Sequence, residues 1–368
     1  MKTHDYHDLA ASVLASNGSY PVWVGWDILA EIGERIKSVY DPSVIYIVSD
    51  DRLHHHVRKV KVALERCTIE THIFFMPSGE SNKTLTTVQH VYRWLAEKKA
   101  ERGHMILGVG GGVVGDLAGF VASTYLRGLR FGLVPTTLLA MMDASIGGKV
   151  AVDLPEGKNL VGSFYQPIFV LSDVKLLRTL PSRELTSGWS EAIKHGLILD
   201  SSLFEMFERN ILQIKTLEPD LATEIIRKSV TVKANVVSQD EKETMGVRIL
   251  LNYGHTVGHA LEAATGFGRY LHGEAVSIGM MAAAHISRSM GLLSDDNVHR
   301  QECLLKRYGL PVSFSDIRIE TILNAMKSDK KTSDGSIRWV LLDEIGHAVT
   351  SDQVPQEFVN DAVLQVRS

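Results

Sequence analysis

The sequence predicts an α/β protein in which a parallel-sheet domain precedes a helical domain. Short apolar runs alternate with helical patterns in the first half, and long helical patterns dominate from about residue 175. Strands that alternate with helices form a parallel sheet covered on both faces. A chain of 368 residues exceeds most single hydrophobic cores. We therefore predict two domains, residues 1–174 and residues 175–368.

The predicted elements follow from apolar spacing and from the residues that end each run. Val44–Val48 is rich in β-branched residues and runs into Asp50, Ile73–Met76 ends at Pro77, and Met105–Val109 enters a glycine cluster. Apolar residues at helical spacing predict a helix over Leu85–Ala96. Later helices are expected over Glu184–Leu199, Leu221–Asp240, His255–Ala264, Gly273–Met290 and Val298–Tyr308, with one further strand over Ile337–Leu342.

Composition and charge exclude several classes of protein. The net charge of -4 gives no reason to expect a nucleic-acid or membrane partner. The N-terminal segment carries charges and lacks the apolar run of a signal peptide, and no run of about 18 uncharged apolar residues predicts a membrane span. The two cysteines, Cys67 and Cys303, fit a reducing compartment. We expect a cytoplasmic protein.

A glycine cluster, GVGGGVVGDLAG, follows the third predicted strand and opens a predicted helix. Gly110, Gly112 and Gly115 match the G-x-G-x-x-G pattern in register. Glycines in this context allow backbone N–H groups to meet a pyrophosphate at a helix N-terminus. The alternative is a close strand–helix crossing that binds no ligand. The pattern favours a dinucleotide site.

This site departs from the standard dinucleotide-binding layout in one respect. An acidic residue is expected about 20 residues further on, where it would hold the ribose. Leu129, Arg130 and Phe131 stand there instead. Asp50, at a strand end, is a substitute ribose contact, and Glu80 and Lys83 are further candidates. We expect a variant of the usual layout.

Lys233 occupies an unusual place on the helix predicted over Leu221–Asp240. Apolar residues cover one arc of this helix at 100° per residue, and Lys233 falls inside that arc. Burial of a lysine is costly unless an anion meets it. The alternative is a lysine that extends its ammonium to solvent at a domain edge.

Further basic residues lie in segments rich in glycine or small residues. These are Arg127, Lys149, Lys158 with its neighbour Asn159, Lys194, and Arg248 four residues before Asn252. Each of these basic residues alone is typical of a solvated surface charge. Together they suggest an anionic substrate that carries phosphate and carboxylate, since those groups need several donors.

Four residues suggest a metal site. His255 and His259 are four apart and share a helix face, a spacing that suits two ligands of one ion. Glu191 points away from the apolar stripe of its helix, where an exposed ion pair with Lys194 is the alternative. His272 precedes an apolar helix. Residue spacing leaves open which three of the four bind.

The motifs together resemble the 3-dehydroquinate synthase family of the sugar phosphate cyclase group. In family order they are GVGGGVVGDLAGFVAS, VPTTLLAMMDASIGGK, GKNLVGSFYQP, SGWSEAIKHG, LNYGHTVGHALE, LHGEAVSIGM and DKK near residue 330. The resemblance implies an N-terminal Rossmann-like domain and an all-helical C-terminal domain. It also implies bound NAD, a divalent zinc or cobalt ion, and a homodimer.

The resemblance assigns roles residue by residue. The implied metal ligands are Glu191, His255 and His272, and His259 moves to the substrate. The implied substrate-binding residues are Arg127, Lys149, Lys158, Asn159, Lys194, Lys233, Arg248, Asn252, His259 and Lys331, with Lys330 as an alternative to the last. The implied cofactor contacts are Asp50, Glu80, Lys83, Gly111, Gly112, Val113, Asp116, Thr136, Thr137, Asp143, Lys149, Lys158, Thr179 and Glu184. Lys194, His259, Asn252 and Asp143 are the implied catalytic residues.

The family reaction converts 3-deoxy-D-arabino-heptulosonate 7-phosphate to 3-dehydroquinate and phosphate. It passes through transient oxidation by NAD, phosphate elimination, reduction, ring opening and an intramolecular aldol. The nearest alternatives are a sister cyclase with another sugar phosphate and a metal-dependent alcohol dehydrogenase. Arg248, Asn252 and His259 favour the dehydroquinate reaction over the first, and the basic residues argue against the second. A non-catalytic nucleotide-binding regulator is a third alternative, against which the intact ligand set argues.

Overall fold

The computed structural model describes residues 7–16, 18–330 and 337–368, with side chains described outside 328–330. The chain forms two compact units. The first unit comprises Met1–Leu180 with Ala222–Lys242, and the second comprises Pro181–Leu221 with Glu243–Ser368.

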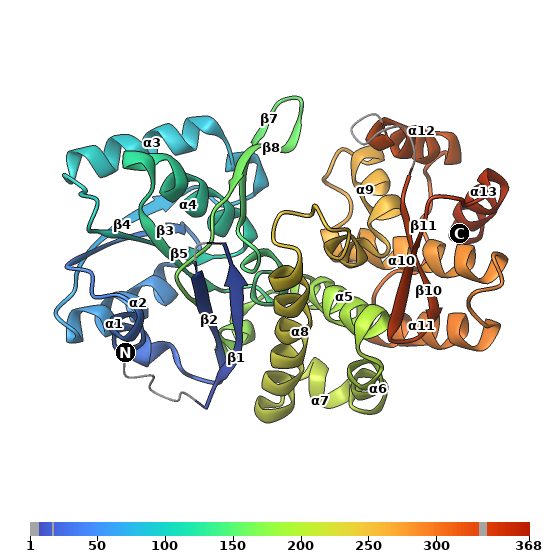
Figure 1. The fold of residues 1–368 in the computed structure, drawn as a ribbon, viewed down its shortest axis with the longest axis horizontal. Helices are drawn as coiled ribbons and strands as arrows, with labels where there is room; N and C mark the ends of the chain where they lie inside the picture. Colours follow the sequence, from blue (N-terminus) through green and yellow to red (C-terminus); the bar gives the residue numbers. More distant parts are fainter. Residues whose placement is uncertain (1–6, 17, 331–336) are drawn as a thin grey trace. The chain divides into compact units, whose positions relative to one another are not determined.

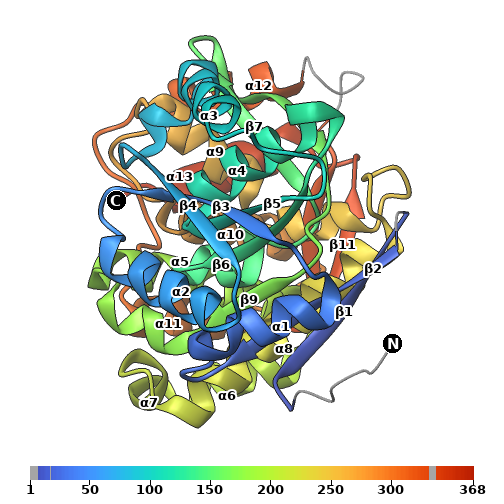
Figure 2. The ribbon, with the colours of Figure 1, turned by 90° about the vertical axis from the view of Figure 1, so that its left-hand side faces the viewer.

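The first unit is built on a sheet whose strands follow the order β1-β2-β9-β6-β5-β3-β4. Its strands are β1 (Leu9–Ala15), β2 (Gly18–Gly25), β3 (Val44–Asp50), β4 (Glu70–Met76), β5 (Met105–Gly110), β6 (Arg130–Pro135) and β9 (Val170–Asp173). All neighbours are parallel except β1 and β2. Helices α1 (Ile32–Val39) and α2 (His54–Arg66) cover one face, and α3 (Leu85–Glu97) and α4 (Gly112–Thr124) cover the other (Figures 1 and 2).

The predicted strands and helix of the first half are confirmed as β3, β4, β5 and α3. The sequence did not predict β1, β2, β6 and β9, so the glycine cluster follows the fifth strand and not the third. Arg130 and Phe131, which stand where an acid is expected, begin β6, and Leu129 directly precedes it. Nucleotides bind at the carboxyl ends of parallel strands, so residues at the amino end of β6 lie at the opposite edge of the sheet. The variant layout is a consequence of this strand order.

The chain reverses direction across the sheet between β3 and β5. Strand β3 lies between β4 and β5, and Ser49 pairs in register with Val109. The carboxyl ends of two such strands form the usual ligand crevice of an open α/β sheet. Asp50 and Gly110 end these two strands. The topology therefore places Asp50 beside the glycine cluster.

Helix α8 (Pro219–Gln239) packs against the outer edge of β1. Thr231 Oγ1 donates to the carbonyl of Ala10 at 3.1 Å, and Ser238 Oγ accepts the N–H of Leu14 at 2.9 Å. These bonds occupy polar groups that an edge strand otherwise exposes. The predicted single boundary near residue 174 is therefore not the division of the structure, in which residues 222–242 return to the first unit.

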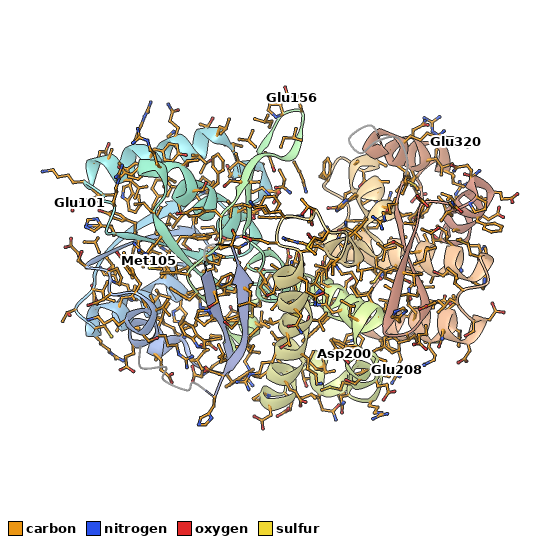
Figure 3. All side chains as sticks on the ribbon, viewed as in Figure 1. Glu101, Met105, Glu156, Asp200, Glu208 and Glu320 are labelled. Atoms are coloured by element: carbon orange, nitrogen blue, oxygen red, sulfur yellow. The ribbon has the colours of Figure 1, made fainter. Side chains whose placement is uncertain are left out.

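Strands β7 (Lys149–Leu154) and β8 (Gly157–Phe164) form a separate antiparallel hairpin in the first unit. Leu154 pairs with Gly157 beside the turn, and Glu156 is exposed at the tip of the hairpin (Figure 3). The hairpin carries Lys149, Lys158 and Asn159. Three residues that the resemblance assigns to ligand binding thus share one small element.

The second unit is mostly helical. Its helices are α5 (Ser182–Leu199), α6 (Ser201–Arg209), α7 (Ile211–Lys215), α9 (His255–Ala264), α10 (His272–Ser289), α11 (Asp295–Tyr308), α12 (Ile319–Lys330) and α13 (Gln356–Gln365). Strands β10 (Trp339–Glu344) and β11 (His347–Ser351) form an antiparallel pair, so the expectation of an all-helical domain is wrong, although the strand predicted near Ile337–Leu342 is present as β10. Helix α10 contacts α5, α9, α11, α13 and β10, and this makes it the core element. None of the described helices has the length and apolar character that a membrane span requires.

Candidate functional site

Three side chains of the second unit converge from separate helices. Glu191 lies on α5, His255 begins α9 and His272 begins α10, and their nearest ligand atoms all lie within 4.8 Å of one another. Nε2 of His255 and Nε2 of His272 each lie 3.8 Å from Oε1 of Glu191. Ligand atoms of a tetrahedral zinc ion are about 3.4 Å apart, given bonds of about 2.1 Å. The spacing suits one ion with small adjustments.

Glycines allow the helices that carry these ligands to approach closely. A Cβ atom on Gly273 would lie 1.9 Å from the carbonyl oxygen of Ser187 on α5. A Cβ atom on Gly279 would lie 1.9 Å from the carbonyl oxygen of Gly254, which caps α9 with a φ of 80°. Larger residues would force α10 away from both neighbours. The glycines therefore help to bring His255 and His272 to Glu191.

Glu191 is a buried carboxylate with one unsatisfied oxygen. Its residue exposure is 0%, and its Oε2 accepts a hydrogen bond from Lys194, which is 1% exposed. Its Oε1 finds no hydrogen-bond partner among the described residues. Buried polar atoms without partners are rare in native structures and point to a missing ligand. The alternative of an exposed ion pair at Glu191 and Lys194 is wrong.

The two histidines present their Nε2 atoms to Glu191 because other groups occupy Nδ1. Nδ1 of His255 lies 3.3 Å from the carbonyl of Tyr253, and Nδ1 of His272 lies 3.2 Å from Oε2 of Glu262. Burial, with a further contribution from Lys194, lowers the pKa of His255 well below its usual range. Two imidazoles and one carboxylate are a donor set that suits zinc or cobalt. These residues fit a divalent metal ion.

His259 lies beside the same group. Its ring centroid is 5.2 Å from that of His255 and 5.9 Å from that of His272, and its side chain is exposed. With Glu262 and His272 it forms a second set of ligand atoms within 4.8 Å. The structure therefore brings together all four residues that the sequence suggested. The set that includes Glu191 contains His255 and not His259.

Two further predicted residues lie on η6 (Arg248–Asn252) of the second unit. Arg248 is 3% exposed, and its Nε lies 3.4 Å from Oε1 of Glu243. Asn252 is exposed, three residues before His255. The element contacts α5, which carries Glu191 and Lys194. The Arg248 guanidinium and the Asn252 amide therefore shortly precede His255 in the chain.

The glycine cluster of the first unit forms the turn from β5 into α4. Gly111 is the N-cap residue, and no side chain in the described structure caps the helix there. A Cβ atom on Gly111 would lie 3.1 Å from Cγ2 of Thr137, and one on Gly112 would lie 3.3 Å from Cβ of Ala144. The first N–H groups of a helix have no partners within it and can bind an anion. This cradle fits a pyrophosphate.

Lys83 is the centre of a charged cluster beside the cradle. It is 3% exposed, and its Nζ lies 2.7 Å from Oδ1 of Asn159 and 2.9 Å from Oε1 of Glu80. Asp116 and Asp153 carboxylates lie 3.2 and 3.6 Å from the same ammonium. Three predicted cofactor contacts and one predicted substrate contact therefore meet here. The sequence did not mark Asp153, which lies near the end of β7.

Asp116 gives this cluster a testable pH dependence. Burial raises its pKa from 3.8 to about 7, against the opposing effect of Lys83. Between pH 3.8 and about pH 7 the folded state binds more protons at Asp116 than the unfolded state does. The contribution of Asp116 to stability therefore falls as the pH rises through this range. Asp116→Asn should therefore stabilise the protein relative to wild type by more at pH 8 than at pH 5, with a ceiling of about 4 kcal/mol. Thermal midpoints of wild type and Asp116→Asn at both pH values measure this difference in stability. Asp295→Asn is the exposed control. A stability difference between variant and wild type that is equal at both pH values would contradict the prediction.

Lys233 is buried, as its position in the apolar arc of α8 predicted. The residue is 5% exposed, and its ammonium donates to the carboxylate and to the carbonyl of Asp143. Asp143 lies in the π-helical turn Ala140–Ala144, with 28% of its side chain exposed. An anion within the first unit thus meets this lysine. Two residues that the resemblance assigns to the active site are joined directly.

The remaining predicted site residues are distributed over both units. Asp50 is 8% exposed and its Oδ1 accepts the N–H of Arg52, Thr136 donates its N–H to Gly110 at 2.9 Å, and Thr179 Oγ1 lies 2.9 Å from Nε2 of His56. Val113 is in the first turn of α4, and Arg127 and Lys149 are exposed in the first unit, where Lys158 is half-buried. Glu184 is exposed on α5 of the second unit, and Lys331 lies outside the described residues, next to the end of α12 at Lys330.

Comparison with protein families covers most of the chain. Residues 73–187 match the model described as 3-dehydroquinate synthase N-terminal, and residues 188–332 match the one described as 3-dehydroquinate synthase C-terminal. A 3-dehydroquinate synthase of Picosynechococcus sp. is 41% identical over 362 residues, 97% of this chain and 98% of that protein. One from Thermoanaerobacter pseudethanolicus is 41% identical over 342 residues, 93% of this chain and 96% of that protein.

Solved structures of sugar phosphate cyclases have the same fold. A 2-deoxy-scyllo-inosose synthase, solved with carbaglucose-6-phosphate, NAD+ and Co2+, is 28% identical with a TM-score of 0.86, over 97% of this chain and 99% of that chain. The 2-epi-5-epi-valiolone synthase of Streptomyces hygroscopicus, solved with NAD+ and Zn2+, has the same identity, 28%, and the same TM-score, 0.86, over 95% and 96%. A butanol dehydrogenase of Thermotoga maritima, 16% identical with a TM-score of 0.66 over 94% and 96%, shares the fold alone.

Proposed function

The chain belongs to the 3-dehydroquinate synthase family, and from this premise we propose that it is an NAD- and divalent-metal-dependent lyase. Its proposed reaction converts 3-deoxy-D-arabino-heptulosonate 7-phosphate to 3-dehydroquinate and phosphate. The observation that carries the proposal is the convergence of Glu191, His255 and His272 within 4.8 Å, with a buried oxygen of Glu191 that has no hydrogen-bond partner in the described part of the chain.

In this proposal Glu191, His255 and His272 hold the metal. A bound divalent metal acts as a Lewis acid that makes a coordinated alcohol easier to deprotonate. Lys194 holds Oε2 of Glu191, which leaves Oε1 as the oxygen available to the ion. Tyr253 and Glu262 hold the Nδ1 atoms of the two histidines. The protein thus orients each ligand before the ion binds. Zinc and cobalt both suit this donor set, and metal analysis of protein purified without added metal identifies the native ion.

The first unit is proposed to bind NAD, which accepts and returns a hydride when bound. The start of α4 would receive the pyrophosphate, because its N–H groups and the glycine cradle suit an anion. Asp50 would hold a ribose from the carboxyl end of β3, and Lys83, Glu80 and Asp116 would contact the cofactor from the charged cluster. Gly111, Gly112, Val113, Thr136, Thr137, Asp143, Lys149, Lys158, Thr179 and Glu184 complete the proposed contacts.

The basic and amide side chains are proposed to bind the phosphate and carboxylate of the substrate. They are Arg127, Lys149, Lys158, Asn159 and Lys233 in the first unit and Lys194, Arg248, Asn252, His259 and Lys331 in the second. Several donors fix one pose of an anionic substrate, and positioning of this kind supplies much of an enzymatic rate. The His259 imidazole and the Lys194 ammonium would handle protons, and Asn252 and Asp143 complete the proposed catalytic set.

Phosphate release tests the proposed reaction. Purified protein should release phosphate from the heptulosonate phosphate when NAD and zinc are present. A sister cyclase is the second candidate. The solved structures with a TM-score of 0.86 are a 2-deoxy-scyllo-inosose synthase and a 2-epi-5-epi-valiolone synthase. Turnover of sedoheptulose 7-phosphate or glucose 6-phosphate, without release from the heptulosonate, would replace the primary proposal with this one. Reduction of NAD by simple alcohols would instead favour a dehydrogenase.

Lys233 offers a test of the proposed substrate contacts. Hydrogen bonds to charged groups contribute about 1.5–3 kcal/mol, so Lys233→Ala should lower kcat/KM roughly 10- to 100-fold. Steady-state kinetics with the heptulosonate phosphate measure this. Lys228→Ala, on the same helix and less buried, should retain wild-type values. Unchanged KM and kcat in Lys233→Ala would remove Lys233 from the substrate site.

The resemblance also supports a homodimer in the cytoplasm as part of the proposal. Light scattering of the purified protein should give twice the chain mass of 40.7 kDa. A monomer with full activity would remove the dimer from the proposal without affecting the reaction. Localisation of a tagged chain tests the compartment.

A further inference from the structure

Glu262 on α9 is a buried carboxylate to which the proposed reaction gives no substrate contact. The residue is 7% exposed, and its Oε2 lies 3.2 Å from Nδ1 of His272. Nε2 of the same ring lies 3.8 Å from Oε1 of Glu191. His272 therefore has one carboxylate at each ring nitrogen, and the two carboxylates come from different helices.

This arrangement favours one tautomer of the His272 ring. A neutral imidazole carries one N–H, and the other nitrogen keeps a lone pair. A carboxylate at Nδ1 accepts that N–H, so the lone pair is on Nε2, the atom directed to Glu191. Carboxylates in this position also fix the ring orientation and raise the basicity of a metal-binding histidine. Glu262 thus prepares His272 as a ligand.

His255 provides an internal comparison. Its Nδ1 faces the backbone carbonyl of Tyr253 at 3.3 Å, a neutral acceptor. The Tyr253 hydroxyl is in turn held by Gln301 at 3.0 Å, which fixes that segment. Both histidines therefore have an acceptor at Nδ1, but only Glu262 brings a negative charge. Since Lys194 offsets the charge of Glu191, a second carboxylate would help to balance a divalent cation.

We propose that Glu262 is a positioning residue that fixes the tautomer and orientation of His272 and raises the affinity of the ligand group for a divalent metal. This inference rests on the proposed function, because it takes Glu191, His255 and His272 as ligands. The competing arrangement is a second ion held by His259, Glu262 and His272, whose ligand atoms also lie within 4.8 Å. In that case Glu262 would contact the metal itself.

Metal affinity in variants at position 262 tests the proposal. Zinc and cobalt dissociation constants are measured by competition with a chromophoric chelator. Glu262→Ala should weaken binding about 10- to 100-fold, and Glu262→Gln should weaken it less, because an amide oxygen still accepts the N–H. Glu302→Gln, which changes an ion-paired carboxylate on α11, is the matched control and should bind as wild type does.

Each outcome separates this inference from the proposed function. Binding of one ion per chain, weakened in the graded order, supports Glu262 as a positioning residue. Affinity of Glu262→Ala within twofold of wild type, or two ions per wild-type chain, overturns it. Failure of wild type itself to bind zinc or cobalt tightly would contradict the proposed metal site and not the role of Glu262 alone.

A second measurement reads the tautomer in the wild-type protein itself. Nitrogen-15 NMR of histidine-labelled, metal-free wild type reports which ring nitrogen of His272 carries the proton, with the signal assigned by its loss in His272→Gln. The proton should be on Nδ1. A proton on Nε2 in wild type would overturn the proposal.

Discussion

Replacing Glu191 by glutamine should abolish tight metal binding and most of the proposed activity. The amide keeps the shape of the side chain but removes the negative charge from an oxygen that has no hydrogen-bond partner among the described residues. Loss of a Lewis acid removes several kcal/mol of transition-state stabilisation, so phosphate release should fall at least roughly 100-fold. Equilibrium dialysis with metal analysis, followed by phosphate release, measures both effects.

The same substitution should also destabilise the metal-free protein. Lys194 is 1% exposed and donates to Glu191, so the variant leaves a buried ammonium without its carboxylate. Removal of one partner from a buried pair costs about 3–5 kcal/mol. Glu205→Gln, in an exposed pair with Arg209, should leave stability and metal binding unchanged. Wild-type zinc affinity in Glu191→Gln would contradict the assignment of this residue as a ligand.

The sequence predicted those elements whose apolar pattern is continuous. β3 and β5 are buried along almost their whole length, and both were predicted. β8 was not predicted, because it is mostly exposed and mixes glycine, polar and apolar residues without alternation. β1, with the sequence LAASVLA, is composed of residues that suit a helix equally well. Periodicity carries no signal where one side of a strand is not consistently buried.

The grouping of α8 with the first unit could not be read from the sequence. The apolar arc of the helix indicates that one face is buried, but it does not indicate against which core. The hydrogen bond that Thr231 donates to β1 and the one that Ser238 accepts from β1 join residues more than 200 positions apart in the chain. Contacts of such long range depend on the packing of the whole unit.

The candidate metal site was partly readable from residue spacing. The interval between His255 and His259 predicted a shared helix face, and their ring centroids lie 5.2 Å apart. The burial of Glu191 was not readable, because the stripe of Trp189, Ile193 and Leu197 suggested that the opposite face was exposed. Helix α5 is instead buried on all sides from Ser187 to Ile198. Glycines and serines in SGWSEAIKHG were the available signal, since small residues allow close packing on a second face.

Glu262 and Asp153 are two carboxylates near the site that the sequence did not identify. Both touch predicted site residues, His272 at 3.2 Å and Lys83 at 3.6 Å. Glu262 lies near the end of α9 and Asp153 near the end of β7, and both have the sequence contexts of ordinary surface carboxylates. Only the fold reveals that they are within reach of a ligand or a buried lysine.

Replacing Lys194 by methionine should destabilise the metal-free protein and make it unusually responsive to zinc. The variant leaves the Glu191 carboxylate, 0% exposed, without its ammonium, at a cost of about 3–5 kcal/mol. Zinc then has an unpaired carboxylate to neutralise, and binding to the folded state stabilises it by about 2.7 kcal/mol at 100 times the dissociation constant. The zinc-dependent gain in stability should therefore exceed that of wild type, whereas Glu191→Gln should show almost none.

Urea unfolding of the full chain, with and without zinc, measures these gains. Phosphate release should remain low in Lys194→Met because the proposed proton-handling ammonium is absent. Lys306→Met removes an exposed partner of Glu302 and is the control, since such pairs contribute little. Equal zinc gains in wild type and Lys194→Met would mean that the ammonium does not hold the carboxylate that meets the metal. Opposite responses at positions 191 and 194, three residues apart on one buried helix, would place the ion at Glu191, because general disruption of α5 would lower the zinc response in both variants.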